Sequence, residues 1–599
     1  MHGPGGPTAI GTGRGAKDTR ATLLRLWAYL KEQRVGLIAV FVMVAVSTIL
    51  STLGPLLMGR AIDDYIIPGD LPGLARISLI MLWIYIATAV VLWGQTYFMA
   101  LVAQRTVRHI RRDLFAKLQS LSLRFFDQRP HGELMSRLTN DVENISSTLT
   151  DATTQFVSGG MTVVAVAAMM LALNVRLALV TLIAIPAMFF LLDWASKHTR
   201  RGFRAQQQYL GELNGIVEET ITGQRVVKAY GQEQAVLDKF GVSNRQLQSA
   251  SIHAQTYALL LGPLSNLVNN ISLAIVAGFG GWMAVMGWVS VGMIATFVSY
   301  ARHFTRPLNQ IAQVYNMIQS ALAGAERVFE LLDEEPEFAD APGALTLENV
   351  RGEVVFDSVD FAYEPGVPVL QNVSLHAEPG QTIALVGPTG AGKTTIVNLL
   401  TRFYDIDAGR IMIDGHDIRD VRKDSLRQLL GIVLQDTFLF SDTVMENIRY
   451  GRLDATDEEV IDAARLANAD HFIRHLPHGY ATPLSEQGGN LSQGQRQLLA
   501  IARAVLADPA ILVLDEATSS VDTRTEVRIQ EALLRLMQGR TAFVIAHRLS
   551  TIRNADQVLV VHGGQIIERG THRELLEARG FYHNLYVSQF KGTAAEMVA

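Results

Sequence analysis

Long apolar runs alternate with polar segments in the first half of the chain, whereas the second half has short apolar runs of strand length. The first half contains five strongly apolar runs, at residues 37–57, 77–103, 156–173, 177–192 and 259–301. A helix that crosses a membrane needs about 20 residues, so the first two runs each predict one span. The shorter third and fourth runs predict two more spans, joined by a tight external turn at residues 174–176. The fifth run is too long for one helix, and Gly287, Ser290 and Gly292 offer a turn that divides it. We therefore predict six spans.

The charges of the connecting segments orient these spans. Residues 61–74 contain three aspartates and no basic residue. Residues 104–140 contain the basic residues Arg105, Arg108, Arg111, Arg112, Lys117, Arg124, Arg129 and Arg137. Because basic loops stay on the cytoplasmic side, we predict a multi-pass protein of the cytoplasmic (inner) membrane. Both termini and the second half of the chain would then be cytoplasmic.

The segment before the first span divides into two parts. Residues 1–19 are rich in glycine and proline, and we predict that they are disordered and include no cleavable signal peptide. Residues 20–35 mix apolar side chains with Arg25, Lys31 and Arg34, which is typical of a helix lying in the membrane interface. The alternative is a soluble amphipathic helix, which the apolar run that follows disfavours.

A glycine-rich loop follows one of the short apolar runs in the second half. Residues 381–386 predict a strand, residues 395–403 predict a helix, and the loop between them fits G-x-x-x-x-G-K-[ST]. In such a loop the backbone N–H groups turn toward phosphate oxygens, the lysine reaches the β- and γ-phosphates, and the next hydroxyl binds Mg²⁺. The pattern predicts a nucleoside triphosphate site formed by Gly387, Pro388, Thr389, Gly390, Ala391, Gly392, Lys393, Thr394 and Thr395.

Two further segments fit the same site. Residues 510–519 (AILVLDEATS) predict a buried strand that ends in Asp515 and Glu516, and such strand ends meet at one edge of a parallel sheet. There Asp515 would hold Mg²⁺ through water, and Glu516 would polarise the attacking water. Residues 491–495 (LSQGQ) open a predicted helix at 496–506. Taken alone, the first segment also fits a turn, and the second a helix cap formed by Ser492.

Together, in this order and spacing, the three segments resemble the nucleotide-binding domain of ATP-binding cassette (ABC) transporters. The resemblance implies binding of ATP and Mg²⁺ and a head-to-tail dimer, in which the LSQGQ signature of one subunit closes over ATP held by the other. The residues that it assigns to the signature are Ser492, Gln493, Gly494 and Gln495. It also assigns adenine stacking to Tyr363, catalytic and Mg²⁺-binding roles to Gln435, the D-loop to Asp522, and the switch histidine to His547.

The order of the two halves resembles exporter-type ABC proteins. The predicted fold is an all-α polytopic membrane domain, followed by an α/β P-loop ATPase domain. Helical periodicity continues through 104–122 and 197–239, and short coupling helices are implied near 131–137 and 219–225. Residues 353–363 alternate as an antiparallel strand does. The predicted domains are the membrane domain at 36–332, a linker at 333–352, the ATPase domain at 353–590 and a tail at 591–599.

Composition agrees with a membrane protein. The 599 residues are 49% hydrophobic and 18% charged, the net charge of −5 does not suggest a nucleic-acid binder, and the absence of cysteine excludes disulfides. The predicted sixth span is unusually polar, because it contains Arg302, Arg306, Asn309, Gln310, Gln313 and Asn316. Together with Asn266, Asn269 and Asn270 in the fifth span, these side chains fit either a substrate path or hydrogen bonds between helices.

These features predict ATP-driven efflux of hydrophobic or amphipathic compounds, either multidrug or lipid-like, by one half of a dimeric exporter. Gln493 stands where glycine is usual in the signature, and the chain most resembles the catalytically competent subunit of bacterial heterodimeric multidrug exporters, because Glu516 is kept. The alternatives are a homodimeric lipid or peptide exporter and an importer built on the exporter fold. A non-transporting ATPase regulator and an ATP-gated channel belong to another class, which the full hydrolytic set disfavours.

Overall fold

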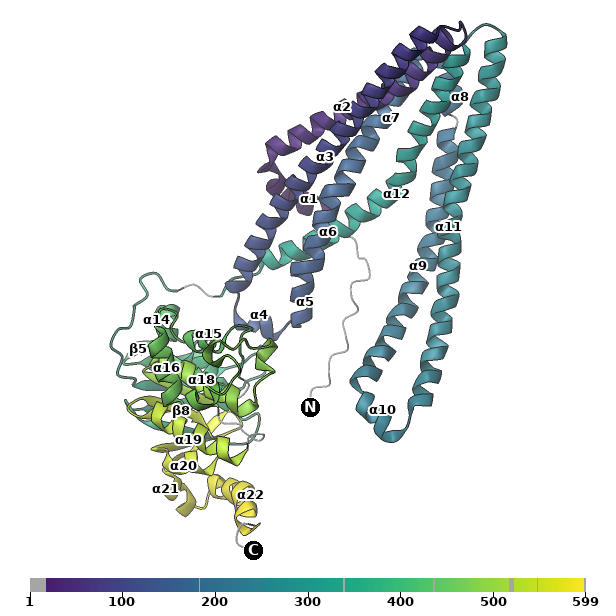
Figure 1. Cartoon of the computed structure of the whole chain (residues 1–599). Helices are drawn as coiled ribbons and strands as arrows, with labels where there is room; N and C mark the ends of the chain where they lie inside the picture. The colour runs from purple at the N-terminus through teal and green to yellow at the C-terminus, as the bar shows by residue number, and fades with distance from the viewer. Residues whose placement is uncertain are drawn as a thin grey trace. The chain divides into compact units, whose positions relative to one another are not determined.

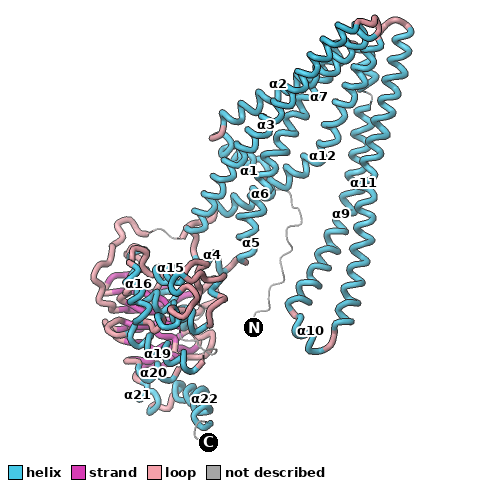
Figure 2. Tube along the Cα trace, in the orientation of Figure 1, coloured by secondary structure: helices cyan, strands magenta, loops and turns pink. Residues whose placement is uncertain are grey.

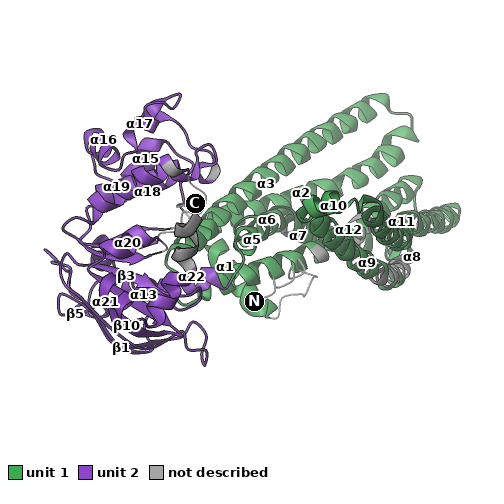
Figure 3. Cartoon of the chain, turned by 90° about the horizontal axis from the view of Figure 1, so that it is seen from below, with its two compact units in different colours: residues 1–121, 129–335 green, residues 122–128, 336–599 purple. Residues whose placement is uncertain are grey.

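The computed structural model describes residues 18–182, 184–337, 340–434, 437–515, 522–546 and 548–596. The chain divides into two compact units (Figure 3). Unit 1 comprises Met1–Leu121 and Arg129–Glu335, and unit 2 comprises Ser122–Gln128 and Pro336–Ala599. A short segment between two parts of the membrane domain therefore belongs structurally to the second unit.

Unit 1 is built from helices, as the sequence predicts (Figures 1 and 2). Its α-helices are α1 (Thr19–Lys31), α2 (Arg34–Arg60), α3 (Leu71–Gln119), α5 (His131–Ser136), α6 (Val142–Ser147), α7 (Thr153–Leu173), α8 (Val175–Leu182), α9 (Ala184–Thr222), α10 (Gln224–Tyr230), α11 (Glu233–Val285) and α12 (Val291–Asp333). Three π-helical turns lie between them: η1 (Ala61–Ile66), η2 (Arg137–Asp141) and η3 (Thr148–Ala152). Four stretches of the described residues are long and apolar enough to cross a membrane: Arg34–Ile66, Leu71–Gln119, His131–Leu173 and Glu233–Val285.

The turns predicted between consecutive spans are present. Asn174 separates α7 from α8, and its side-chain oxygen accepts a hydrogen bond from the backbone N–H of Leu177 at 3.0 Å. Gly287, with φ of +72°, follows α11 in the left-handed conformation that glycine adopts readily. Ser290 then caps α12 by accepting a hydrogen bond from the N–H of Met293. Both turns place polar groups where a helix leaves backbone groups without partners.

The long helical extension predicted at 197–239 is interrupted. It forms a hairpin in which α9 ends at Thr222, the short α10 follows after Gly223, and Gly231, with φ of +60°, turns the chain into α11 (Figure 1). Side chains at the tip of this hairpin are exposed, Tyr230 to 75% among them. The extension predicted at 104–122 is helical as far as Gln119.

Unit 2 is an α/β domain with two sheets (Figure 2). Its strands are β1 (Val354–Phe361), β2 (Leu370–Ala377), β3 (Thr382–Val386), β4 (Ala408–Ile413), β5 (His416–Asp417), β6 (Leu430–Val433), β7 (Ile511–Asp515), β8 (Thr541–Ile545), β9 (Gln557–His562) and β10 (Gln565–Gly570). Its helices are α4 (Leu123–Asp127), α13 (Lys393–Leu400), α14 (Lys423–Gln428), α15 (Val444–Arg449), α16 (Asp457–Leu466), α17 (Asp470–Ile473), α18 (Gln493–Ala507), α19 (Thr523–Met537), α20 (Leu549–Asn554), α21 (His572–Glu577) and α22 (Phe581–Glu596). The antiparallel sheet has the order β2-β1-β4-β5, and the six-stranded sheet has the order β10-β9-β3-β8-β7-β6.

Strand β7 shows how the larger sheet is covered on both faces. Its alternate residues Ile511 and Val513 belong to a core shared with the antiparallel sheet. Leu512 and Leu514 belong to a second core, formed with helices that include α16, α18 and α19. A nearly continuous apolar run is what a strand buried on both faces requires. The strands predicted at 353–363 and 381–386 are confirmed, and so is the part of the strand predicted at 510–519 that the structure describes, up to Asp515.

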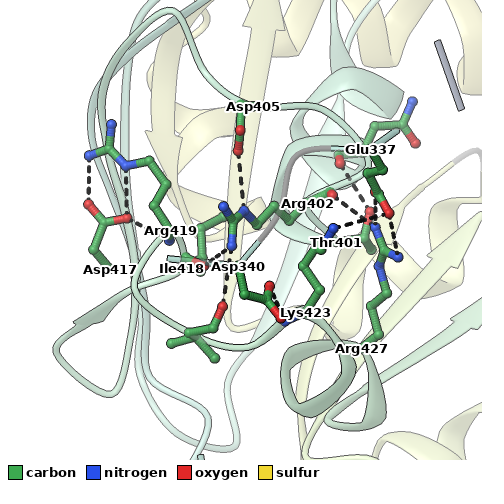
Figure 4. A network of polar contacts seen from close by, with 12 residues as sticks. Glu337, Asp340, Thr401, Arg402, Asp405, Asp417, Ile418, Arg419, Lys423 and Arg427 are labelled. Atoms are coloured by element: carbon green, nitrogen blue, oxygen red, sulfur yellow. Dashed lines mark hydrogen bonds and ion pairs between the residues drawn. The ribbon is translucent and has the colours of Figure 1, made fainter. Parts of the chain in front are cut away.

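The predicted linker is attached to unit 2 along much of its length. Leu345 donates its N–H to the carbonyl of Asp420, and its own carbonyl accepts from the N–H of Arg422. Glu337 forms an ion pair with Arg427 at 2.6 Å and another with Lys423 at 3.4 Å (Figure 4). At the other end of the domain α22 continues to Glu596, so the expected tail is helical up to that residue.

Candidate nucleotide-binding site

The phosphate loop joins β3 to α13, as predicted. Helix α13 begins at Lys393, and its N-cap residue Gly392 has φ of +104° and offers no side chain to the first backbone N–H groups of the helix. A Cβ atom on Gly387 would lie 2.1 Å from the carbonyl oxygen of Val561, so a side chain does not fit there. A helix N-terminus without a side-chain cap is a favourable place for an anion, because its N–H groups and dipole are positive.

The side chain of Lys393 lies inside this loop. Its ammonium donates hydrogen bonds to the carbonyl oxygens of Gly387 at 2.8 Å and Pro388 at 2.9 Å, and the residue is only 7% exposed. Burial lowers the pKa of Lys393, and the negative charge of Asp515 partly offsets this effect. The ammonium is therefore held at the loop by acceptors that a phosphate group can replace.

The ends of three parallel strands bring the other predicted residues to the same edge. In the sheet register Leu385 of β3 and Asp515 of β7 both pair with Ile545 of β8. The loop after β3, the carboxylate of Asp515 and the residues after β8 therefore leave the sheet at one edge. Thr394, in the first turn of α13, is exposed and has the hydroxyl that this motif offers to Mg²⁺. Asp515 and Thr394 are thus residues of the right type for a Mg²⁺ ion held together with phosphate oxygens.

Tyr363 follows β1, and its phenol points to α13. Its hydroxyl donates to the Oγ1 atom of Thr395 at 3.3 Å and accepts from the side-chain amide of Asn398 at 3.3 Å. Its ring packs edge-to-face against Phe361 and Tyr404, with centroid separations of 4.8 and 5.0 Å. These contacts fix an aromatic ring beside the phosphate loop, where an adenine base can stack on it.

Helix α4 contributes to the same region, which the sequence did not predict. Arg124 donates to the backbone carbonyl of Tyr363 at 2.6 Å, and Asp127 accepts a hydrogen bond from the hydroxyl of Tyr404. Burial raises the pKa of Tyr404, and the bond and charge of Asp127 raise it further. A cavity of about 270 Å³ is lined by Arg124, Asp127, Gln128, Tyr363, Glu364, Asn398 and Tyr404.

The coupling helix predicted at 131–137 corresponds to α5 and η2, and α4 lies just before it in the chain. In unit 2 the segment against the ATPase fold is α4, whereas α5 (His131–Ser136) belongs to unit 1. The sequence signal for the contact of α4 with the ATPase fold was the pair of charged residues Arg124 and Asp127, which flank Phe125 and Phe126. The second predicted position, 219–225, spans the end of α9 and the start of α10.

The signature loop opens α18 with a capping box. The Oγ atom of Ser492 accepts from the N–H of Gln495 at 3.3 Å, and the Gln495 side chain accepts from the N–H of Ser492 at 2.9 Å. Gly494 is buried, whereas Ser492 remains exposed. The helix-cap interpretation of Ser492 is thus correct, and its exposed position also leaves it open to a ligand. Gln493 is the first residue of α18.

Asp522 caps α19 by accepting a hydrogen bond from the N–H of Thr525 at 3.0 Å. Backbone and side-chain hydrogen bonds from Thr525 lower the pKa of Asp522, so the carboxyl is ionised at neutral pH. The three predicted catalytic residues Gln435, Glu516 and His547 lie outside the described residues.

Comparison with known proteins agrees with this arrangement. Residues 37–308 match the family described as the ABC transporter transmembrane region, and residues 370–519 match the family described as ABC transporter. The protein YfiC of Bacillus subtilis (strain 168), named as an uncharacterized ABC transporter ATP-binding protein, is 49% identical over 96% of this chain and 95% of its own length. The chain belongs to the ABC transporter family.

Other relatives of this ABC transporter have more specific names. A fatty acid ABC transporter ATP-binding/permease protein of Mycobacterium bovis is 46% identical over 87% of this chain and 83% of its own. An ATP-dependent lipid A-core flippase of Syntrophus aciditrophicus is 39% identical over 89% of both chains. The solved structure of a bacterial Atm1-family ABC exporter with ATP bound has a TM-score of 0.76 and 32% identity, and covers 93% of this chain and 98% of that one.

These matches establish several of the predictions. The chain is an exporter-type half-transporter, in which a helical membrane domain is followed by an α/β ABC ATPase domain. Its activity is ATP hydrolysis coupled to transport, and its cofactors are ATP and Mg²⁺. It is a multi-pass membrane protein that works in the lipid bilayer as part of a dimer.

Proposed function

We propose that this ABC transporter exports hydrophobic or amphipathic, lipid-like compounds across the cytoplasmic membrane, with its ATPase domain in the cytoplasm. The observation that carries the proposal is the joining, in one chain, of an exporter-type membrane domain with an ATPase domain whose phosphate loop and signature helix are both formed. Two relatives are named as a fatty acid transporter and a lipid A-core flippase. These names favour lipid-like compounds over drugs as the substrate class. The outward direction is part of the proposal and is supported by the similarity to an Atm1-family ABC exporter.

The roles of the undescribed catalytic residues are part of the proposal. Glu516 follows Asp515 directly, and Asp515 lies at the strand edge beside Lys393. A carboxylate there can polarise the attacking water, while Gln435 and His547 contact the γ-phosphate and Gln435 also contacts Mg²⁺. The ATP would be bound between the phosphate loop of one subunit and Ser492, Gln493, Gly494 and Gln495 of the other.

Helix α4 would carry the movement of the ATPase domain toward the membrane domain. Tyr363 contacts the ring of Tyr404, and Tyr404 in turn donates to Asp127 of α4. Because stacking of adenine on Tyr363 acts on a ring that is tied to α4, binding of ATP and displacement of α4 are linked. The second predicted coupling helix, at 219–225 in the hairpin tip around α10, would also rest on the ATPase domains of the dimer.

The substrate path would include polar residues of the fifth and sixth predicted spans. Among the described side chains, Arg302 of α12 and Asn266 and Asn270 of α11 are exposed in this chain. Polar side chains in a span are stable when they face water or another subunit. Hydrogen bonds to the partner's helices remain the alternative.

We propose a second, different half-transporter as the partner, because the chain most resembles one half of the bacterial heterodimeric exporters and Gln493 replaces the usual glycine of the signature. Glu516 is kept, so this chain would be the catalytically competent half. This chain would then supply Glu516 to one ATP site and its signature to the other. A homodimer is the alternative, since one chain carries both halves of a composite site and two copies complete two sites.

A transport measurement tests the function. Inside-out membrane vesicles are prepared from cells that make the wild-type protein, the Glu516→Gln variant or neither, and accumulation of radiolabelled oleate and of a fluorescent phospholipid is followed with Mg²⁺ and ATP. We expect accumulation of at least one probe with the wild-type protein only. Uptake in right-side-out vesicles instead would indicate an importer, and equal accumulation with the variant would contradict ATP-driven export.

A further inference from the structure

The end of α2 and the beginning of α12 are joined by a carboxylate. Asp63, in the π-helical turn after α2, accepts a hydrogen bond from the N–H of Gly292 at 2.7 Å and another from the hydroxyl of Ser290. Ser290 is the N-cap residue of α12, and Gly292 lies in its first turn. One side chain thus satisfies donors at the start of a helix that is 227 residues away in the sequence.

Next to this carboxylate the backbones of α2 and α12 are in close contact, at Gly59 and Gly292. A Cβ atom on Gly292 would lie 2.1 Å from the carbonyl oxygen of Gly59, and a Cβ on Gly59 would lie 2.0 Å from the hydroxyl of Thr296. No residue with a side chain fits at either position without a shift of the backbone. Such close approach of small residues is common where helices pack in membranes.

Two hydroxyl groups of α12 continue the contact along α2. Thr296 donates to the carbonyl of Pro55 at 3.1 Å, and Tyr300 donates to the carbonyl of Thr52 at 2.8 Å. Both hydroxyl-bearing residues are buried. We call the set formed by Thr52, Pro55, Gly59 and Asp63 on one side and Ser290, Gly292, Thr296 and Tyr300 on the other the outer seam.

Most bonds of the outer seam can separate at small cost. The exception is Tyr300, whose buried hydroxyl has to find another acceptor when it leaves the carbonyl of Thr52. A backbone carbonyl has two lone pairs, so α2 keeps its own helical hydrogen bonds when Thr296 and Tyr300 leave. Thr296 also donates to the carbonyl of Gly292 in its own helix at 2.9 Å, and it therefore keeps a partner. Gly59 and Gly292 have no side chains, so no interlocked side chains have to separate where these two residues meet. Asp63 and Ser290 lie at the loop end of the helices, where water can replace their mutual bonds.

We propose that the outer seam is a releasable latch, which holds the outer end of this chain's transport pathway closed and opens during the ATP cycle. The inference rests on the proposed function, because a transporter that alternates between two openings has to part helices at this end. Asp63 is its principal holding group, since its charged oxygens make the stronger bonds of the seam.

The chain contains no cysteine, so spin labels can be placed at two chosen sites only. Ile67, just after η1, is 62% exposed, and Met286, beside the turn before α12, is 54% exposed. Cysteines at these positions are labelled in the full-length Glu516→Gln chain, assembled with unlabelled partner subunit in lipid bilayers. Pulsed EPR then gives the distance distribution without nucleotide and with Mg²⁺ and ATP. We expect one short distance without nucleotide and a longer population with ATP.

Two variants open the latch by different means. Asp63→Ala removes the carboxylate, and Gly292→Ala places a methyl group against the carbonyl of Gly59. We expect each to raise the long-distance population without nucleotide about fivefold or more. In Asp63→Ala the cause is the loss of hydrogen bonds to a charged group, and in Gly292→Ala it is the added methyl group that forces the two backbones apart. The matched controls are Asp64→Ala, an exposed neighbour of Asp63, and Gly281→Ala, where an added methyl group meets no atom within 4 Å.

The outcomes separate the latch from the proposed function. Distributions of Asp63→Ala and Gly292→Ala that match those of their controls would overturn the latch, while vesicle transport would still support export. A label pair that ATP leaves unchanged in the reference chain would also overturn it, because the seam would then be a permanent joint. Failure of transport with normal opening of the seam would instead contradict the proposed substrate class.

Discussion

The ammonium of Lys393 donates a hydrogen bond to the carbonyl oxygen of Gly387 at 2.8 Å, so the backbone of the phosphate loop holds the loop's own lysine. Burial also lowers its pKa. A bound phosphate replaces these neutral acceptors with charged ones, and the exchange strengthens the bonds of the lysine.

Replacement of this lysine tests its part in hydrolysis. Lys393→Met keeps the length of the side chain and removes its charge, and we expect the rate of ATP hydrolysis to fall by about 100-fold or more, as loss of one electrostatic stabiliser does in other enzymes. Lys393→Arg is the matched control that keeps the charge. It should restore little of the rate of ATP hydrolysis, because a planar guanidinium does not fit a site for a compact ammonium. Hydrolysis at the wild-type rate by Lys393→Met would contradict the assignment.

The phenol of Tyr363 allows stacking and hydrogen bonding to be separated. Tyr363→Phe keeps the ring but loses the bonds to Thr395 and Asn398. Because neutral hydrogen bonds contribute about 1 kcal/mol, we expect the KM for ATP to rise about threefold to tenfold with kcat unchanged. Tyr363→Ala also loses the stack, and its KM should rise further. Equal KM values for the two variants in a steady-state assay would show that the ring does not stack on the base.

Ser492 has a structural role and a proposed catalytic role, and two substitutions distinguish them. Ser492→Ala removes the cap of α18 and should destabilise the ATPase domain by about 1 kcal/mol, whereas Ser492→Gly costs only a few tenths. Both variants lose the hydroxyl that would contact ATP. We therefore expect similar losses of hydrolysis but different midpoints of thermal unfolding. A variant Ser492→Gly with full activity would mean that Ser492 acts only as a helix cap.

The attachment of the linker predicts a dependence of stability on pH. Burial opposes ionisation of Glu337, but hydrogen bonds and charges from Arg427 and Lys423 together lower its pKa. A carboxyl with a lowered pKa stabilises the folded state above its ordinary pKa of about 4.3, and the contribution is lost as pH falls through the lowered value.

Glu337→Gln should therefore lower the free energy of unfolding of the ATPase domain by about 2 kcal/mol at pH 7. The difference from wild type should shrink below about pH 4. Glu348→Gln is the control, because Glu348 is an exposed glutamate of the same segment. Chemical denaturation at several pH values measures the effect, and a difference that persists unchanged at pH 3 would assign it to packing rather than to charge.

Local elements were predictable where one stretch of sequence carries its own signal. The apolar run of β7 ends at Asp515, the glycines of the phosphate loop precede α13, and Ser492 and Gln495 form the capping box of α18. Each pattern involves neighbours within a few positions, because strand burial, helix capping and tight turns are set by short segments.

Contacts between distant segments were not predictable in the same way. Arg124 and the carbonyl of Tyr363 are 239 positions apart, and the sequence analysis did not connect α4 with the region around Tyr363. The attachment of Glu337 depends on Arg427, 90 positions away, so an acidic, proline-containing segment gave the pattern of a free linker. Such contacts depend on how helices and strands pack against one another in the folded protein. Composition and periodicity do not specify this packing.

ATP hydrolysis by the intact complex is the decisive measurement, on complexes purified through this chain from the membranes of the cells that encode it, with wild-type protein and with Glu516→Gln. We expect Mg²⁺-dependent turnover by the wild-type complex. The variant should hydrolyse ATP at least about 100-fold more slowly and still retain bound nucleotide. A variant that turns over at the wild-type rate would show that the site formed at the phosphate loop and the end of β7 does not hydrolyse the ATP that drives transport.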